Sequence, residues 1–314
     1  MIFIHSVIFY PSSKILKTIV DLSQFVVVAF IFCSAYLFYQ KESDLKVGNS
    51  LVYFRKRFSR LLLPYYIFLP FLIGSLWFSD KKLITTNFIF SLLTMSFPYP
   101  FWDWLIVIFL FLSILMPLTM FLLKKYRLLF STFSFLSVLS SIILLFYRPQ
   151  FNFKLIMWLP WMSVVFYAWF FVENKNKKHY LIEISFFILL AIFVLSLFTL
   201  WYLNNSLLHF DNKFPPNIFH LSYGLILTTL LFVFFQKFQL PRAISSTLSF
   251  FSKHSYSVYF IHIVLLYFIV GFFKLFYPSG VPWVVFFGVL VGTTIITQML
   301  SIYLFSALKR GPTI

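Results

Sequence analysis

Three histidines lie in apolar stretches of this 314-residue sequence: His5, His220 and His262. A neutral imidazole is the least costly titratable side chain to bury, and near pH 7 it can act as a general base. The alternative is a histidine that only hydrogen-bonds a neighbouring helix. The other histidines lie at or beyond the ends of apolar stretches, and we expect them to be solvated or interfacial: His179, His209 and His254.

Two arginines spaced three residues apart, Arg57 and Arg60, directly precede the apolar run that begins at Leu61. Side chains at this spacing share one face of a helix, and guanidinium groups fit phosphate oxygens. Taken alone, the pattern favours a topology anchor that binds anionic lipid head groups at the mouth of a membrane span. The alternative is a site for a phosphate-bearing ligand.

Paired prolines and an asparagine, Pro215, Pro216 and Asn217, open another apolar run. The prolines stiffen the backbone and Asn217 can cap the helix that follows, so this segment alone is interpreted as a structural turn. No metal site is expected, because the histidines show no i, i+4 pairing and lack nearby carboxylates. The single cysteine, Cys33, excludes an internal disulfide.

The composition indicates a membrane protein: 61% of the residues are hydrophobic, 11% are charged and the mean hydropathy is +0.93. No globular core could hide so much apolar surface from water. The net charge of +17 does not favour nucleic-acid binding, because the longest basic run is Arg55-Lys56-Arg57. No carboxylate falls in the middle of an apolar stretch, which disfavours a proton- or ion-coupled transporter.

The apolar stretches predict an all-α fold, a polytopic transmembrane helix bundle of about ten spans with an abbreviated first helix. Residues 1–9 are too short to cross a bilayer, and form either a re-entrant helix or the outer half of a span that begins upstream. Leu83–Phe97 is predicted to be an interfacial or re-entrant helix. The expected spans are 22–39, 61–78, 101–123, 128–147, 155–172, 180–203, 217–236, 255–273 and 281–307.

The basic residues predict the topology, because cytoplasmic loops collect Lys and Arg. Seventeen of the 25 fall on one side if the N-terminus faces the same side as the loops 40–60, 124–127, 173–178, 237–253 and 308–314. We therefore expect a multi-pass protein of a bacterial-type cytoplasmic (inner) membrane with both termini in the cytoplasm. Residues 1–314 are expected to form one integral-membrane domain with no appended soluble domain.

Five motifs in order, from residue 3 to about residue 300, resemble acyltransferase family 3, polytopic enzymes that acylate surface carbohydrates. The family's motif in the second helix ends in Gly and an aromatic residue, where this chain has Ala35 and Tyr36. The family's arginine upstream of the first histidine has no counterpart in this sequence. The motifs are Phe3-Ile4-His5-Ser6, Phe30-Ile31-Phe32-Cys33-Ser34-Ala35-Tyr36, Arg57-Phe58-Ser59-Arg60, Pro215-Pro216-Asn217 with Ser222-Tyr223-Gly224, and Ser255-Tyr256-Ser257-Val258-Tyr259-Phe260-Ile261-His262.

The resemblance implies transfer of an acyl group, most commonly acetyl, from a cytoplasmic acyl-CoA co-substrate to a hydroxyl of a cell-surface or lipid-linked carbohydrate, with no tightly bound cofactor. It implies that Arg57 and Arg60 bind the donor, and that His5 is the general base or transiently carries the acyl group. Expected to line the cavity and orient the reacting groups are Ser34, Tyr36, Tyr256, Tyr259 and His262. The alternatives are a transporter or flippase for a lipid-linked glycan and an inactive membrane scaffold.

Overall fold

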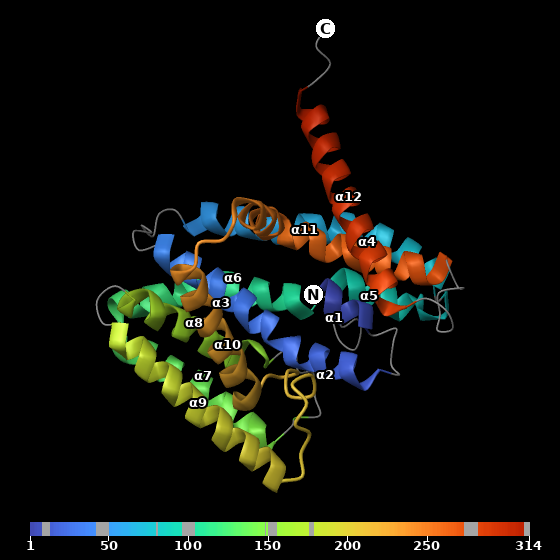
Figure 1. Cartoon of the computed structure of the whole chain (residues 1–314). Helices are drawn as coiled ribbons and strands as arrows, with labels where there is room; N and C mark the ends of the chain where they lie inside the picture. The colour runs from blue at the N-terminus through green and yellow to red at the C-terminus, as the bar shows by residue number, and fades with distance from the viewer. Residues whose placement is uncertain are drawn as a thin grey trace. The chain divides into compact units, whose positions relative to one another are not determined.

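The computed structural model describes residues 1–7, 13–41, 50–79, 81–95, 104–147, 149, 156–175, 179–272 and 282–310. These residues form helices joined by turns and contain no β-strand, which confirms the all-α prediction (Figure 1). The helices are α1 (Ile2–Val7), α2 (Lys14–Leu22), η1 (Ser23–Phe25), α3 (Val26–Lys41), α4 (Ser50–Ser79), η3 (Lys81–Leu83), α5 (Thr86–Thr94), α6 (Trp104–Lys125), α7 (Arg127–Phe146), α8 (Trp158–Asn174), α9 (His179–Tyr202), α10 (Ile218–Lys237), α11 (Arg242–Phe272) and α12 (Trp283–Arg310).

Eight helices in the described part of the chain are long and apolar enough to cross a membrane. A ninth apolar helix, α8, has 17 residues, which corresponds to about 25 Å. Helix α1 has only six residues and covers about 9 Å, so the abbreviated first helix is confirmed as a helix but not as a span. The predicted number of ten crossings is therefore not confirmed.

Two predicted loops are partly helical. Helix α4 begins at Ser50 and α11 at Arg242, so much of the predicted loops 40–60 and 237–253 continues the adjoining span. Arg and Lys are good helix formers, and no Pro or Gly interrupts these approaches to the apolar runs. The predicted loop residues 42–49, 176–178 and 311–314 lie outside the described residues.

The predicted short helix at Leu83–Phe97 is confirmed over α5. The hydroxyl of Tyr65 donates to the carbonyl of Leu92 at 2.6 Å, and that of Tyr66 donates to the carbonyl of Leu93 at 3.1 Å. These bonds join α4 to α5. The depth of α5 in the membrane stays a prediction.

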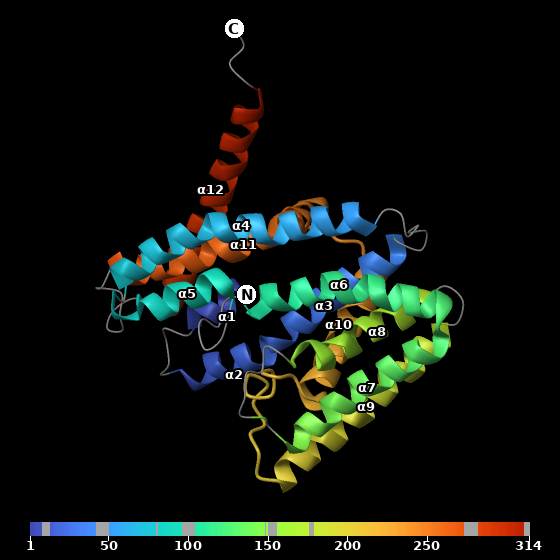
Figure 2. The same cartoon turned by 180° about the vertical axis from the view of Figure 1, so that it is seen from behind.

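One compact unit comprises residues 21–61 and 95–238. Within it, α3 packs against α8 and α10 (Figure 1), and α6, α7 and α8 pack against one another (Figure 2). Aromatic rings fill the contact between α3, α8 and α10, with centroids 5.5 Å apart for Phe32 and Phe171 and 4.9 Å apart for Phe171 and Phe232. On α9, Phe187 and Leu195 are each 66% exposed, as expected for side chains that face lipid.

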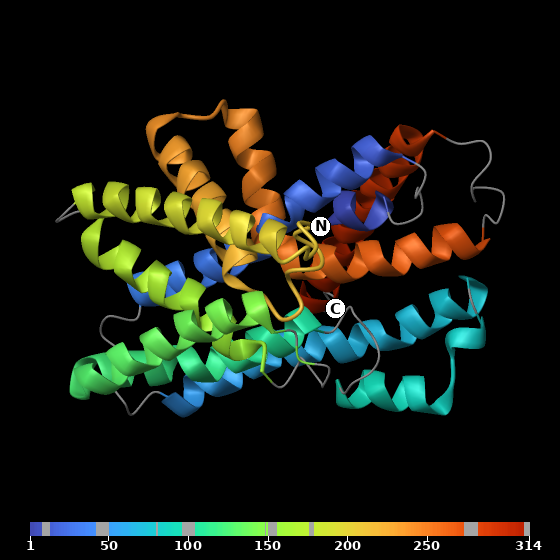
Figure 3. The ribbon, with the colours of Figure 1, turned by 90° about the horizontal axis from the view of Figure 1, so that it is seen from below.

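The other compact unit comprises residues 1–20, 62–94 and 239–314. Here the short α1 packs against α11 and α12 (Figure 3). A buried cluster of apolar side chains joins α11 to α12, and Ile2 of α1 packs against that cluster. The cluster consists of Leu266, Ile269, Phe286 and Leu290.

Gly224 lies where α10 and α3 approach each other closely. A β-carbon at this position would lie 2.6 Å from Cβ of Val28, which is a stiff β-branched side chain. We expect Gly224→Ala to destabilise the protein by about 1–3 kcal/mol through overpacking. Thermal unfolding of the purified protein in detergent measures this loss.

The matched control is Gly74→Ala in α4, where a β-carbon meets nothing within 4 Å and where Ala is the better helix former. Adding Val28→Ala to Gly224→Ala is expected to recover stability. Equal unfolding temperatures for Gly224→Ala and Gly74→Ala would contradict the close approach of α10 and α3.

Candidate active site

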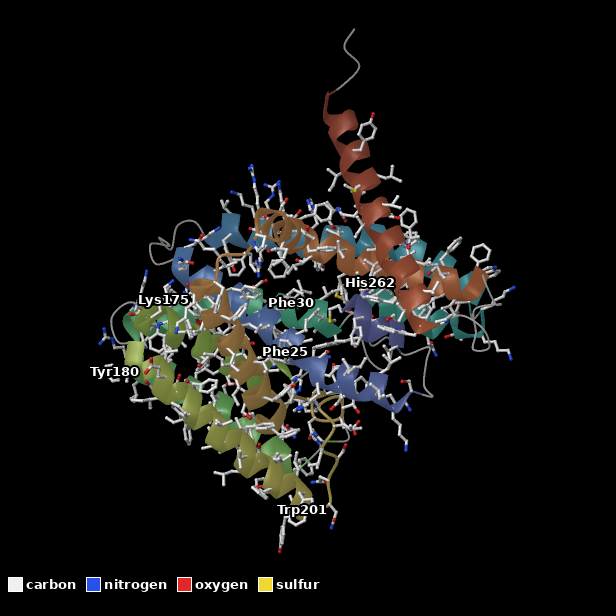
Figure 4. The ribbon with its side chains drawn as sticks, viewed as in Figure 1. Phe25, Phe30, Lys175, Tyr180, Trp201 and His262 are labelled. Atoms are coloured by element: carbon white, nitrogen blue, oxygen red, sulfur yellow. The ribbon has the colours of Figure 1, made fainter. Side chains whose placement is uncertain are left out.

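Two of the predicted histidines meet in the structure. His5 Nδ1 of α1 lies 2.9 Å from His262 Nε2 of α11, and the two rings are stacked with centroids 5.1 Å apart. His262 is fully buried, whereas His5 is half-buried. Figure 4 shows His262 on α11. The chain thus brings together two imidazoles that are 257 positions apart.

The neighbouring backbone determines which nitrogen carries each proton. His262 Nδ1 lies 3.0 Å from the carbonyl oxygen of Val258, which can only accept a hydrogen bond. Nδ1 of neutral His262 is therefore protonated and its Nε2 carries the lone pair. It follows that His5 Nδ1–H donates to His262, and that the lone pair of neutral His5 lies on Nε2, where it can accept a proton.

Helix α12 holds the short α1 in place. The indole Nε1–H of Trp283 donates to Ser6 Oγ at 3.1 Å, and Ser6 Oγ–H donates to the carbonyl of Phe3 at 2.8 Å. The rings of Phe3 and Trp283 meet edge to face at 5.4 Å. Sequence reasoning missed Trp283, because no local pattern relates it to the residue beside His5.

The two predicted tyrosines of α11 differ in their surroundings. Tyr259 is buried, with its ring 5.6 Å from that of His262 and 6.3 Å from that of His5. The ring of Tyr256 packs edge to face on Phe260 at 4.8 Å. Tyr259 is therefore in contact with the histidine pair.

The predicted arginine pair lies on α4, in the other compact unit. Arg57 is half-buried: its Nε donates to Ser113 Oγ at 3.2 Å and its Nη2 donates to Ser34 Oγ at 3.0 Å. Arg60 is exposed one turn later. The structure thus explains Ser34 as a partner of Arg57, and it brings in Ser113 of α6, which sequence reasoning did not identify.

Tyr36 belongs to the aromatic core of the same unit. Its ring lies 5.1 Å from that of Phe232. Its hydroxyl accepts a hydrogen bond from Lys175 Nζ, which also lies 4.7 Å from the centre of the Tyr36 ring. Figure 4 marks Lys175 directly after α8. Tyr36 therefore contacts a cation, although the role predicted for it was to orient substrate.

The segment before α10 is a hydrogen-bonded turn, as predicted from its prolines. Asn217 caps α10: its Oδ1 accepts from the backbone N–H of His220 at 3.2 Å. Asn217 Nδ2 donates to Asn212 Oδ1 at 2.6 Å. Pro216 pairs with Lys213 across the turn, and the peptide bond before Pro215 is cis.

His209 was predicted to be solvated or interfacial, and the structure shows that it is not solvated. It is 4% exposed, and its ring stacks on Tyr223 at 4.0 Å and on Phe219 at 4.6 Å. The turn that carries it is bound by Asp21, whose carboxylate accepts the backbone N–H groups of His209 and Phe210. Burial lowers the pKa of the His209 imidazole, and Asp21 opposes this shift.

Lys213 is the main polar residue that the sequence analysis did not identify as a site. It is 5% exposed, and its Nζ donates to Gln24 Oε1 at 2.9 Å. The ammonium also lies 4.8 Å from the ring centre of Trp104 and 5.0 Å from that of Phe214. Burial lowers the pKa of Lys213 to about 7. The only sequence signal for a site at Lys213 was its position two residues before the paired prolines.

A family model described as an acyltransferase domain matches residues 1–302. Neither the curated proteins nor the solved structures contain a match to this chain.

Lys213 predicts a pH dependence of stability. The unfolded chain keeps this lysine protonated up to about pH 10.4, whereas the folded protein releases the proton near pH 7. Between these values the unfolded state binds more protons, so stability rises with pH by up to about 1.4 kcal/mol per pH unit. The penalty is present in full below pH 7.

Unfolding temperatures of wild type and Lys213→Met, measured from pH 7 to pH 10 in buffers free of carboxylate and phosphate, test this expectation. The wild type should gain stability relative to the variant across this range. Parallel curves for the two proteins would contradict the shifted titration of Lys213.

Proposed function

The chain belongs to the acyltransferase family whose model spans residues 1–302, and on this premise we propose that it moves an acyl group, acetyl first of all, from cytoplasmic acyl-CoA to a hydroxyl of a cell-surface or lipid-linked carbohydrate. The protein is a multi-pass membrane acyltransferase. The donor, the acceptor and the inner-membrane location with both termini in the cytoplasm are parts of the proposal.

The contact between His5 and His262 is the main observation that supports the proposed acyl transfer. A hydroxyl attacks a thioester well only when a base removes its proton. With Nδ1–H donated to His262, His5 offers Nε2 as that base, and the His262 lone pair stabilises the imidazolium that forms. His262 is thus a positioning residue, in the way that a third group orients the base in other acyl-transfer enzymes.

The proposed reaction balances without any further reactant. His5 Nε2 takes the proton of the acceptor hydroxyl while the oxygen attacks the thioester carbonyl carbon, and a C–O bond forms. The tetrahedral intermediate collapses, the C–S bond breaks, and the imidazolium returns its proton to the leaving thiolate. The products are an ester and free CoA, and His5 is neutral again.

Arg57 and Arg60 are proposed to hold the phosphates of the donor. Guanidinium groups remain charged and bind phosphate oxygens in a defined geometry. The two serine hydroxyls on Arg57 orient its side chain without neutralising its charge. Arg60 is exposed and keeps its charge available to solvent.

The family match favours an enzyme over a transporter or flippase. An activity assay separates an enzyme from an inactive scaffold, because a scaffold would show no acyl transfer with any donor. Membrane lipid is the expected surrounding of the protein, and no nucleic acid is proposed as a partner.

Substitutions of the histidine pair test the base. His5→Ala is expected to lower acyl transfer by about 100- to 10,000-fold, the usual contribution of a general base. His262→Leu removes the acceptor of the His5 proton and should cost about 10- to 100-fold. The measurement is transfer from radiolabelled acetyl-CoA to glycan in membranes with matched protein levels.

His262→Gln is the control, because its amide oxygen can accept the same hydrogen bond; it should retain more activity than His262→Leu. The acidic limb of the pH–rate profile should move to lower pH in His262→Leu only, because the imidazolium of His5 loses its acceptor. Full activity in His5→Ala would contradict the proposed mechanism.

Replacing the exposed arginine tests donor binding. Arg60→Ala is expected to raise the KM for acetyl-CoA about tenfold with little change in kcat, because one charge-assisted hydrogen bond to phosphate is lost. Steady-state kinetics with varied acetyl-CoA measures both constants.

Arg55→Ala is the matched control, since Arg55 is also exposed on α4 but is displaced from the face that Arg57 and Arg60 share. It should leave KM unchanged. Equal KM values for Arg60→Ala and wild type would show that this pair does not hold the donor.

A further inference from the structure

A second group of polar side chains lies in the compact unit of residues 21–61 and 95–238. Among the described residues, His220 Nδ1, His220 Nε2 and Trp161 Nε1 are buried without a hydrogen-bond partner. The two rings are fully buried and meet edge to face at 6.0 Å. Buried polar atoms are seldom left unpaired in native proteins, and each such atom points to a bound water, ion or ligand.

Lys213 adds a buried positive charge to these atoms. It interacts electrostatically with His220, and the Trp104 ring beneath it is stacked on Trp161 at 6.3 Å. The partners of the ammonium are an amide oxygen and two aromatic faces, and in the described part of the chain no carboxylate pairs with it. A buried ammonium without a counter-charge is costly, even over aromatic rings.

Two acidic side chains near this turn, among the residues that the structure describes, are engaged elsewhere. Asp21 accepts two backbone N–H groups of the turn, and Asp211 accepts the hydroxyl of Ser206. Neither supplies the charge that Lys213 lacks. A bound water could satisfy the unpaired nitrogens but would leave the charge uncompensated.

We propose that Lys213, His220 and Trp161 form a binding site for a singly charged carboxylate of the kind that an acidic sugar carries. The ammonium supplies one positive charge, and the Trp161 indole and neutral His220 each supply one N–H donor for the carboxylate oxygens. The carboxylate follows from these contacts alone, whereas the sugar rests on the carbohydrate acceptor proposed above.

Binding of glucuronate to the purified full-length protein tests this site. In nanodiscs of zwitterionic lipid at pH 6.5, sodium glucuronate is expected to raise the unfolding temperature by at least about 2 °C in a saturable manner. Glucose with sodium chloride at the same ionic strength should produce no shift. Equal shifts from the two additives, or a larger shift from inorganic phosphate, would overturn the carboxylate site.

Two lysines provide a matched pair of variants. Lys213→Met should abolish the glucuronate shift. Lys81→Met should retain it, because Lys81 also lies over an indole, 4.1 Å from the ring centre of Trp77, but is exposed. His220→Phe should reduce the shift by removing one donor. A glucuronate shift that persists in Lys213→Met would overturn the proposal.

A further measurement uses the wild type alone, so it does not depend on whether a variant folds. Only the charged lysine attracts a carboxylate, so glucuronate affinity should fall by up to about tenfold per pH unit above pH 7. The other titratable groups near Lys213 are His209, His220 and Asp21. Burial lowers the pKa of the His209 imidazole, so this ring carries no charge above pH 7. Affinity that does not change between pH 7 and pH 9 would contradict the role of Lys213. Because the readout is binding, it is independent of acyl transfer.

Discussion

Hydrocarbon offers no hydrogen bonds, so a polar group that this chain places among its apolar helices needs a partner in the protein or in a bound ligand. The backbone meets this constraint by forming helices throughout the apolar runs. The side chains meet it individually: serine and threonine hydroxyls mostly donate to carbonyls of their own helix, as Thr119 does to Met116 at 2.8 Å. Other polar side chains in the described part of the chain reach another helix, and they mark places where helices are fixed to one another.

Some of these contacts between helices involve the residues of chemical interest. The pair of His5 and His262 joins α1 to α11, and the bond from Trp283 to Ser6 joins α1 to α12. A six-residue helix could not hold a base in place by itself, because isolated short helices are unstable. Its position depends on α11 and α12, so the geometry of His5 is a property of three helices.

The limits of sequence reasoning follow from the same contacts. The cap by Asn217 could be predicted, because its partner, the backbone N–H of His220, lies three positions away. Arg57 and Arg60 were expected to act as a pair, but the hydroxyls that bind Arg57 come from 23 and 56 positions away, and they make the two arginines different. His209 was expected to be solvated or interfacial, and its burial depends on rings and a carboxylate that no local pattern reveals.

Because acidic residues are scarce in this chain, the cations at these sites have neutral partners. The chain has 8 Asp and Glu against 25 Lys and Arg, and the inward-facing cations described here are held by neutral groups: Arg57 by two serines, Lys213 by an amide and two aromatic rings. A carboxylate partner would hold each cation more strongly but would cancel its charge. Neutral partners fix the position of the cation while leaving its field uncompensated. The proposed donor carries phosphates, and the proposed acceptor can carry a carboxylate. An enzyme that binds them needs positive charges that its own carboxylates do not neutralise.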